Sequence, residues 1–384
     1  MKPKRVLFVA HSANRGGAEY CLDTTLNHLD RKRFEPLVAF PFEGPMVDSA
    51  RAMGMETLVM PMCHWLYFEK DLWYWKNLIG RSHSNIRQLT KLIRERRIDL
   101  VYTNTSAIFE ASIAAKRAGV AHIWHIHEVL RPGNSMSQLL PIVWMQRIIR
   151  KYSNQVIFES RSAQAAFEET TTLPKADVVY NSQRLETNRL LEDVTAFRLE
   201  HGLRDGVATV VFVGQFIDRK NPLLLIDALA HIAPRTAVQC LLVGQGPLES
   251  EMRARIAELG LEQLCKMLPF QQNISKVLSV ADMLVLPSRQ ESFGLVLVEA
   301  GAFGKPVIAC DCQGPNEIIS DDQTGIIVPQ ADANSLAEAI GRLVRSPELA
   351  REMGRAGFQR VNELFSPEKN TLQLEALMDK LCRV

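Results

Sequence analysis

The sequence predicts an α/β protein of two domains, each built around a parallel sheet. The chain has 384 residues, of which 47% are hydrophobic, and this is enough for two cores at roughly 150 residues per domain. Short apolar runs alternate with longer segments whose apolar residues recur at helical spacing. Such alternation is typical of parallel strands that helices cover on both faces.

In the first half, continuous apolar runs predict six buried strands. They cover residues 5–10, 37–40, 57–60, 100–103, 122–126 and 155–159. Helix-period segments lie between several of these runs. Ile86, Leu89 and Ile93, for example, define the apolar face of one helix, and basic residues lie on its other faces.

The second half repeats the alternation. It predicts strands at 209–213, 239–243, 282–286 and 307–309, and helices at 221–232, 248–259, 295–303 and 335–343. A further helical pattern ends the chain, from Leu372 to Leu381. We therefore expect a first domain over residues 1–182, a polar linker region over 183–206, a second domain over 207–365 and a C-terminal helix over 366–384.

Charge and composition exclude several classes of protein. The net charge is +2, which argues against a dedicated nucleic-acid binder. The seven cysteines are irregularly spaced, and no apolar run is long enough for a signal peptide or a membrane span, so we expect a cytoplasmic protein with reduced thiols. Charge is unevenly divided, at +7 through Ser182 and −5 after it. This asymmetry predicts an anionic partner or an anionic membrane surface, unless it arose by chance.

Two motifs follow strands of the first domain. Gly16 and Gly17 lie between a strand and a helix, where they would admit an anion or simply form a tight turn. The segment matches neither a P-loop nor a dinucleotide fingerprint. His125 and His127 face the same side of their strand and precede Glu128. They could line a cleft or bind a metal, although the sequence offers no third ligand.

Three motifs follow strands of the second domain. Arg219 and Lys220 lie just before a helix, where two cations repel each other unless an anion joins them. Gly244 belongs to a glycine-rich turn. Glu291 lies in a loop before a helix, and Glu299 lies one to two turns into that helix, so the two carboxylates could hold different parts of one extended ligand. Each motif also has a purely structural interpretation, as surface charges, turn residues or helix-start acids.

The segment 64–76 holds three of the five tryptophans, with lysines nearby. This composition suggests contact with a membrane interface or an acceptor, or a loop tucked onto the core of the first domain.

Together these motifs resemble glycosyltransferase family 4, the retaining group 1 enzymes with the GT-B fold. The resemblance extends over nearly the whole chain and is most specific between Val211 and Pro329. Its signature is a pair of glutamates, Glu291 and Glu299, with seven residues between them that include Phe-Gly-Leu. It implies two Rossmann-like domains facing across a deep cleft, with the last helix packed back on the first domain.

The resemblance also implies roles for single residues. Glu299 would hold the ribose of a nucleotide, Glu291 the donor sugar, and Lys220 the diphosphate. His127 would lie near the donor sugar, with Glu291, His127 and Lys220 forming the catalytic group. The remaining donor-binding residues would be Gly16, Gly17, Gln215, Arg219, Gly244, Phe270, Gln271, Phe293, Gly294 and Leu295.

The implied reaction is retaining transfer of a sugar from a nucleoside-diphosphate sugar, with UDP expected before GDP, to a saccharide or lipid-linked acceptor. It would need neither a cofactor nor a metal, and would serve surface polysaccharide or glycolipid synthesis, in the cytoplasm or at the inner face of the cell membrane. Gln215 departs from the pattern because many relatives carry arginine there, although Arg219 could compensate. The alternatives are a non-catalytic nucleotide-sugar-binding subunit, a GT-B sugar-nucleotide epimerase and a glycogen-type synthase.

Overall fold

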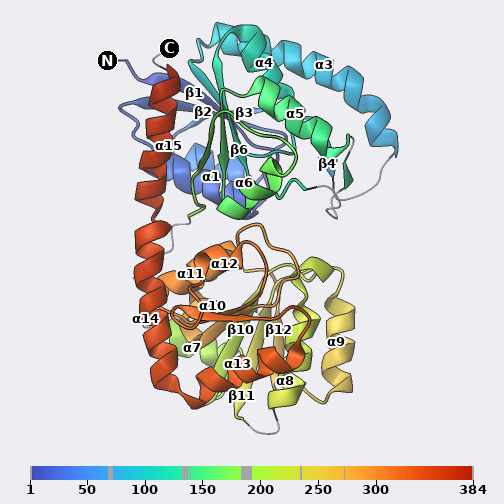
Figure 1. Cartoon of the computed structure of the whole chain (residues 1–384), viewed down its shortest axis with the longest axis vertical. Coiled ribbons are helices and arrows are strands. Elements are labelled where there is room, and N and C mark those ends of the chain that lie inside the picture. The colour runs from blue at the N-terminus through green and yellow to red at the C-terminus, as the bar shows by residue number, and fades with distance from the viewer. Residues whose placement is uncertain are drawn as a thin grey trace. The chain divides into compact units, whose positions relative to one another are not determined.

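The computed structural model describes residues 2–67, 72–131, 137–138, 140–182, 193–233, 236–271 and 273–382 (Figure 1). The chain divides into two compact units. The first contains residues 1–183 together with 367–384, and the second contains residues 184–366. Each unit has its own parallel sheet, which confirms the predicted α/β class with two Rossmann-like domains.

The sheet of the first unit has seven parallel strands in the order β3-β2-β1-β5-β6-β8-β9. Those strands are β1 (Lys4–Val9), β2 (Phe34–Phe40), β3 (Glu56–Val59), β5 (Leu100–Thr103), β6 (Ala121–Ile126), β8 (Gln155–Phe158) and β9 (Ala176–Val178). Strands β4 (Leu66–Tyr67) and β7 (Ser137–Gln138) form a separate antiparallel pair.

Helices cover both faces of this sheet. They are α1 (Gly17–His28), α2 (Pro45–Ala52), α3 (Leu72–Glu95), α4 (Glu110–Ala118), α5 (Ile142–Tyr152), α6 (Arg161–Glu168) and α15 (Pro367–Cys382). Alternate residues of β1 point to opposite faces. Val6 and Phe8 pack with α1, α2 and α15, whereas Leu7 and Val9 pack with α3 and α4. Glu375 ties α15 to the unit because it accepts a hydrogen bond of 2.7 Å from the backbone N–H of Asp30.

The sheet of the second unit has six parallel strands in the order β12-β11-β10-β13-β14-β15. Those strands are β10 (Ala208–Val213), β11 (Val238–Val243), β12 (Cys265–Leu268), β13 (Met283–Leu286), β14 (Val307–Cys310) and β15 (Gly325–Val328). This is the strand order of a classical Rossmann fold.

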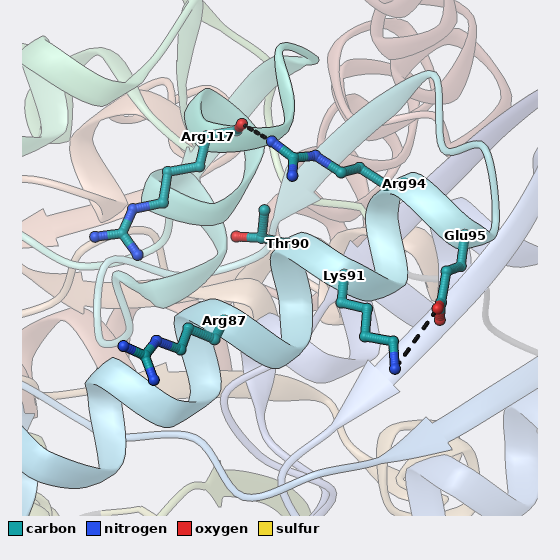
Figure 2. A pocket seen from close by; sticks show the side chains of 6 residues that line it. All are labelled: Arg87, Thr90, Lys91, Arg94, Glu95 and Arg117. Carbon is teal, nitrogen blue, oxygen red and sulfur yellow. Dashed lines mark hydrogen bonds and ion pairs between the residues drawn. The ribbon is translucent and has the colours of Figure 1, made fainter.

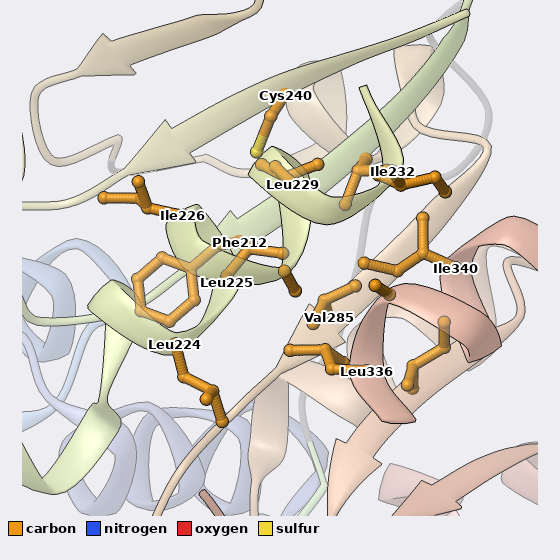
Figure 3. Packing of buried hydrophobic residues seen from close by; sticks show 14 of the residues in the cluster. Phe212, Leu224, Leu225, Ile226, Leu229, Ile232, Cys240, Val285, Leu336 and Ile340 are labelled. Carbon is orange, nitrogen blue, oxygen red and sulfur yellow. The ribbon is translucent and has the colours of Figure 1, made fainter. Parts of the chain in front are cut away.

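The helical elements of the second unit are α7 (Asp193–Glu200), the 3-10 helix η1 (Asp218–Lys220), α8 (Pro222–Ile232), α9 (Glu249–Glu258), α10 (Ser275–Val280), α11 (Leu295–Ala302), α12 (Pro315–Ile318), α13 (Ala333–Arg345) and α14 (Pro347–Leu364). Figure 3 shows the core between α8, α13 and the sheet, where Leu225 and Leu229 of α8 belong to the same buried cluster as Leu336 and Ile340 of α13. Deleting such fully buried side chains typically costs 2–5 kcal/mol.

The predicted linker region contains structure of its own. Helix α7 belongs to the second unit, and its Phe197 packs with Leu203 against the strand residues Val211 and Leu241. Residues 193–203 are therefore part of the second unit, whereas residues 183–192 lie outside the described part of the chain.

In both sheets the strand order reverses next to the first strand, between β1 and β5 and between β10 and β13. Helices connect to opposite faces at such a point, and loops at the carboxyl ends of the strands diverge to leave room for a ligand. The loops that follow these four strands are therefore where a binding site is expected.

Candidate functional site

The loops after β10 and β11 of the second unit are in direct backbone contact. Gly214 donates a hydrogen bond of 3.0 Å to the carbonyl of Val243. Gly244 has a φ of 153°, and a Cβ atom there would lie 1.9 Å from the carbonyl oxygen of Gly214. Only glycine permits this approach. Gly244 therefore fixes the position of the loop that leads to Arg219 and Lys220.

Glu291, which follows β13, is the anion between the two cations that follow β10. Its carboxylate accepts a hydrogen bond from the Lys220 ammonium and lies 3.7 Å from the Arg219 guanidinium. Glu291 is buried and the Lys220 side chain is 15% exposed. The group carries one net positive charge, so it can still attract an anion. The sequence predicts both residues but gives them separate ligands, and the structure pairs them.

The start of helix α11 contributes backbone donors. Gly294 precedes the helix with a φ of 96°, and no side chain caps the helix start. Phe293 is buried and packs edge-to-face on Phe365, with ring centroids 5.6 Å apart. Gly314 packs closely against the loop before α11, since a Cβ atom on Gly314 would lie 2.5 Å from the backbone of Phe293. The N–H groups at the Leu295 end of this loop thus have a fixed direction, which suits binding of a phosphate.

Glu299 is a buried acid on α11. Burial raises its pKa to about 8. Among the described residues, the structure gives its carboxyl group no hydrogen-bond or ion-pair partner. A buried carboxyl without a protein partner is costly to keep, and such groups gather at functional sites.

This burial predicts how stability depends on pH. The folded protein keeps a proton on Glu299 that the unfolded chain releases between pH 4.5 and about 8, so stability falls as the pH rises through that range. We expect Glu299→Gln to raise the free energy of unfolding by about 4 kcal/mol at pH 8 and to leave it unchanged near pH 4. Urea unfolding across this range measures the effect. Glu352→Gln, at an exposed position of α14, is the control, and equal pH profiles for the two variants would contradict the assignment.

The other predicted donor residues of the second unit lie at the same edge of its sheet. Gln215 follows β10 and is exposed. Phe270 and Gln271 follow β12; Phe270 is 47% exposed, and the Gln271 amide donates to the carbonyl of Pro269 at 3.2 Å. The exposed ring of Phe270 is available to stack on a flat base.

In the first unit, the Gly16–Gly17 loop leads into α1. A Cβ on Gly16 would lie 2.6 Å from a carboxyl oxygen of Glu19, whereas nothing lies within 4 Å of one on Gly17. Glu19 is buried, which raises its pKa to about 7, and it lies 3.2 Å from the imidazole of His11. Gly16 therefore makes room for Glu19, and Gly17 leaves the helix start open.

His127 and Glu128 lie in a buried polar network after β6. The His127 Nε2 atom is 3.1 Å from the Asn104 amide oxygen, and its Nδ1 atom is 3.5 Å from Glu159. Glu128 accepts hydrogen bonds from Ser106, at 3.0 Å from the backbone and 2.6 Å from the hydroxyl. Burial alone would raise the pKa of Glu128, but the nearby His11 and these hydrogen bonds hold it below its ordinary value.

Several members of this network belong to none of the sequence motifs. Asn104 follows β5, Glu159 follows β8, and Asn181 donates a hydrogen bond to Glu159. The positions of Asn104 and Glu159 directly after strands were a usable signal, because carboxyl ends of parallel strands share one edge.

His125 and His127 do lie side by side, with ring centroids 4.1 Å apart, but they differ in role. His125 is buried, with its Nδ1 atom 2.5 Å from the Tyr102 hydroxyl, and burial lowers its pKa. It belongs to the core. Within the described residues, no group of three or more His, Cys, Asp or Glu side chains is arranged to hold a metal ion.

The aromatic segment 64–76 is described only in part. Trp65 is 1% exposed and stacks on Trp124, so the tucked-loop interpretation holds for this residue. The His64 imidazole lies 3.0 Å from the carbonyl of His11. The side chains of residues 67–80 lie outside the described ones. No helix in the described part of the chain is long and apolar enough to cross a membrane.

Comparison with known proteins supports one family over most of the chain. The model described as "Glycosyltransferase Family 4" matches residues 15–185, and that described as "Glycosyl transferases group 1" matches residues 193–360. N-acetyl-alpha-D-glucosaminyl L-malate synthase of Bacillus anthracis is 31% identical over 208 residues, which cover 53% of this chain and 54% of that protein.

D-inositol 3-phosphate glycosyltransferase of Nocardia farcinica is 36% identical over 173 residues, 42% of this chain and 38% of the relative. The matched region thus spans about half, or less, of these curated relatives.

The fold is shared along the whole length with a solved structure. Anabaena Alr3699/HepE, crystallised in complex with UDP, superposes with a TM-score of 0.84 at 22% identity, covering 98% of this chain and 100% of that one. The chain belongs to the group 1 glycosyltransferases of glycosyltransferase family 4, and its two α/β domains are those of the GT-B fold.

Proposed function

We propose that this protein is a retaining glycosyltransferase that takes its sugar from a nucleoside-diphosphate sugar, with UDP as the preferred nucleotide. The observation that carries the proposal is the arrangement at one edge of the second sheet. Lys220 and Arg219 follow β10, and the start of α11 and the buried acid Glu299 follow β13, on either side of the switch point. Cations and helix-start donors attract a diphosphate, and a carboxyl group can hold the hydroxyls of a ribose.

The same residues supply the chemistry of the leaving group. Negative charge develops on the nucleoside diphosphate as the glycosidic bond breaks, and fixed cations stabilise it more in the transition state than in the ground state. We assign this role to Lys220, with Arg219 beside it. Because two cations and backbone donors serve that purpose, we propose that the reaction is metal-independent. Glu291, which orients Lys220, would also contact the donor sugar.

Arg219 supplies the second cation that the site would otherwise lack because Gln215 replaces the expected arginine. Its guanidinium faces the same carboxylate as Lys220, so the site keeps two cations although the expected arginine is absent. This arrangement favours an active enzyme over a non-catalytic nucleotide-sugar-binding subunit.

Relatives support the choice of substrates. The Anabaena protein was crystallised with UDP and with UDP-glucose, and the relatives named above are an N-acetyl-alpha-D-glucosaminyl L-malate synthase and a D-inositol 3-phosphate glycosyltransferase. We propose a saccharide or lipid-linked acceptor, bound by the first unit, and a role in surface polysaccharide or glycolipid synthesis in the cytoplasm.

Donor turnover tests the proposal. We expect release of nucleoside diphosphate from one sugar nucleotide of a panel of UDP- and GDP-sugars, accelerated by an acceptor mixture and unaffected by a chelator. NMR of the product should show the anomeric configuration of the donor. Conversion of the donor into an isomeric sugar nucleotide, without transfer, would instead identify an epimerase. Binding without any turnover would favour the non-catalytic subunit.

A further inference from the structure

A basic groove on the first unit shares no lining residue with the polar network around His127. It is lined by Arg87, Thr90, Lys91, Arg94 and Glu95 of α3 and by Arg117 of α4, and its volume is about 580 Å³ (Figure 2). The neutralising contact is the pair between Lys91 and Glu95, at 3.6 Å. Among the described residues, Arg87, Arg94 and Arg117 have no acidic partner, so the groove carries a surplus of about three positive charges.

Helical spacing explains why these cations gather. Arg87, Lys91 and Arg94 are three and four residues apart and therefore lie on one face of α3. The opposite face packs into the core through Leu89 and Ile93. Arg94 donates a hydrogen bond of 2.7 Å to the carbonyl of Arg117, which joins α3 to the end of α4.

The positive surface continues onto α5. Lys116, beside Arg117, donates a hydrogen bond of 3.2 Å to the carbonyl of Lys151, the penultimate residue of that helix. Both lysine ammonium groups lie over the ring of Tyr152, at 5.2 and 5.3 Å. The sequence of α5 contains no acidic residue. The cations of α3, α4 and α5 thus form one connected surface.

An exposed tryptophan lies on the same helix. Trp144 of α5 is 57% exposed, and the guanidinium of Arg147 lies 5.6 Å from its ring. Arg147, Arg150 and Lys151 follow it at helical spacing and are also exposed. Aromatic rings beside cations are typical of surfaces at the membrane interface, where the ring enters the headgroup layer and the cations meet lipid phosphates.

We propose that the exposed face of α3, α4 and α5 docks on an anionic lipid bilayer, with headgroup phosphates in the groove around Arg87 and Arg94. Charge complementarity and the exposed Trp144 favour a bilayer over a soluble polyanion, which offers no apolar layer for the indole. The guanidinium groups match phosphate oxygens in geometry as well as in charge. This docking requires no donor and no turnover, so it can be tested apart from the proposed function.

Vesicle binding by the full chain tests the docking. We expect cosedimentation with vesicles of phosphatidylcholine containing about one-third phosphatidylglycerol, weakened by salt, and little with phosphatidylcholine alone. The triple variant Arg87→Glu/Lys91→Glu/Arg94→Glu should bind at least about 100-fold more weakly, because each cation near an anionic surface contributes about fivefold and each new carboxylate is repelled. Trp144→Ser should weaken binding about tenfold at high salt, where the electrostatic part is screened.

A matched variant shows whether vesicle binding depends on where the cations lie or only on the net charge of the protein. Arg253→Glu/Arg351→Glu/Arg355→Glu changes three exposed cations of the second unit by the same total charge, and we expect vesicle binding within about threefold of wild type. Circular dichroism checks the fold of both variants. Equal losses in the two triple variants, or no vesicle binding by wild type, would overturn the proposal. Retention on an acidic polysaccharide without vesicle binding would likewise overturn it, and would assign the groove to a saccharide.

Discussion

We expect Lys220→Met to lower the rate of sugar transfer by at least about 100-fold, the typical cost of removing one group that stabilises a leaving charge. The ammonium of Lys220 is held by the buried carboxylate of Glu291, so its position is set before any donor binds. Steady-state rates with a saturating acceptor measure the effect. Arg355→Met, which removes an exposed cation of α14, is the control and should leave the rate unchanged.

A double variant distinguishes catalysis from folding. Lys220→Met leaves the Glu291 carboxylate with the more distant Arg219 and the Ser288 hydroxyl, so we expect the free energy of unfolding to fall by about 2 kcal/mol, less than for a fully buried pair. Glu291→Gln should restore most of that stability in Lys220→Met/Glu291→Gln, since no buried carboxylate is then left at position 291 and the half-buried Arg219 still reaches water. It should not restore transfer. A near-normal rate in Lys220→Met, or recovery of the rate together with stability, would contradict the assigned role.

We also expect Gly244→Ala to lower the free energy of unfolding by about 3 kcal/mol and to abolish binding of nucleotide, because steric clash and backbone strain add. The new methyl group would lie 1.9 Å from the carbonyl of Gly214, so the loops after β10 and β11 must separate. That separation displaces the segment leading to Lys220. Urea unfolding and isothermal titration with nucleoside diphosphates measure the two effects.

Gly260→Ala is the matched control. Gly260 lies in the same unit and has a φ of 65°, but nothing lies within 4 Å of an added Cβ. This variant should cost only the left-handed backbone strain, about 1 kcal/mol, and should bind nucleotide normally. If Gly244→Ala is no more damaging than Gly260→Ala, close backbone packing is not what fixes this loop.

Much of the fold follows from the sequence because its central strands are continuous apolar runs. Residues 100–103 and 209–213 were predicted within one residue of β5 and β10. The missed strands lie at sheet edges, where one side is unpaired and the pattern is weaker. Strand β12 includes Lys266, and β15 begins at Gly325, which the close approach of β14 requires. Neither short strand resembles a buried apolar run.

The sequence predicts the single residues of the candidate site but not the contacts between them. The loops that hold Lys220 and Glu291 are 71 residues apart, and only the adjacency of β10 and β13 brings them together. The sequence does not predict helix α7 because its segment is mostly polar. The buried ring of Phe197 packs this helix against the second unit. The sequence predicts basic residues on the outer faces of the helix that is α3, but we make no prediction from it for α5. The connection of the two helices through Lys116 depends on tertiary structure.

The central claim, that the second unit binds a nucleoside-diphosphate sugar, is tested most directly by thermal unfolding against UDP, GDP and their sugars. A ligand that binds only the folded protein, at 100 times its dissociation constant, adds about 2.7 kcal/mol and should raise the melting temperature by roughly 5 °C. We predict a rise with uridine nucleotides that is absent in Glu299→Gln, although that variant is itself more stable at pH 8. The claim would be contradicted if no nucleoside diphosphate or sugar nucleotide changed the melting temperature of the wild-type protein.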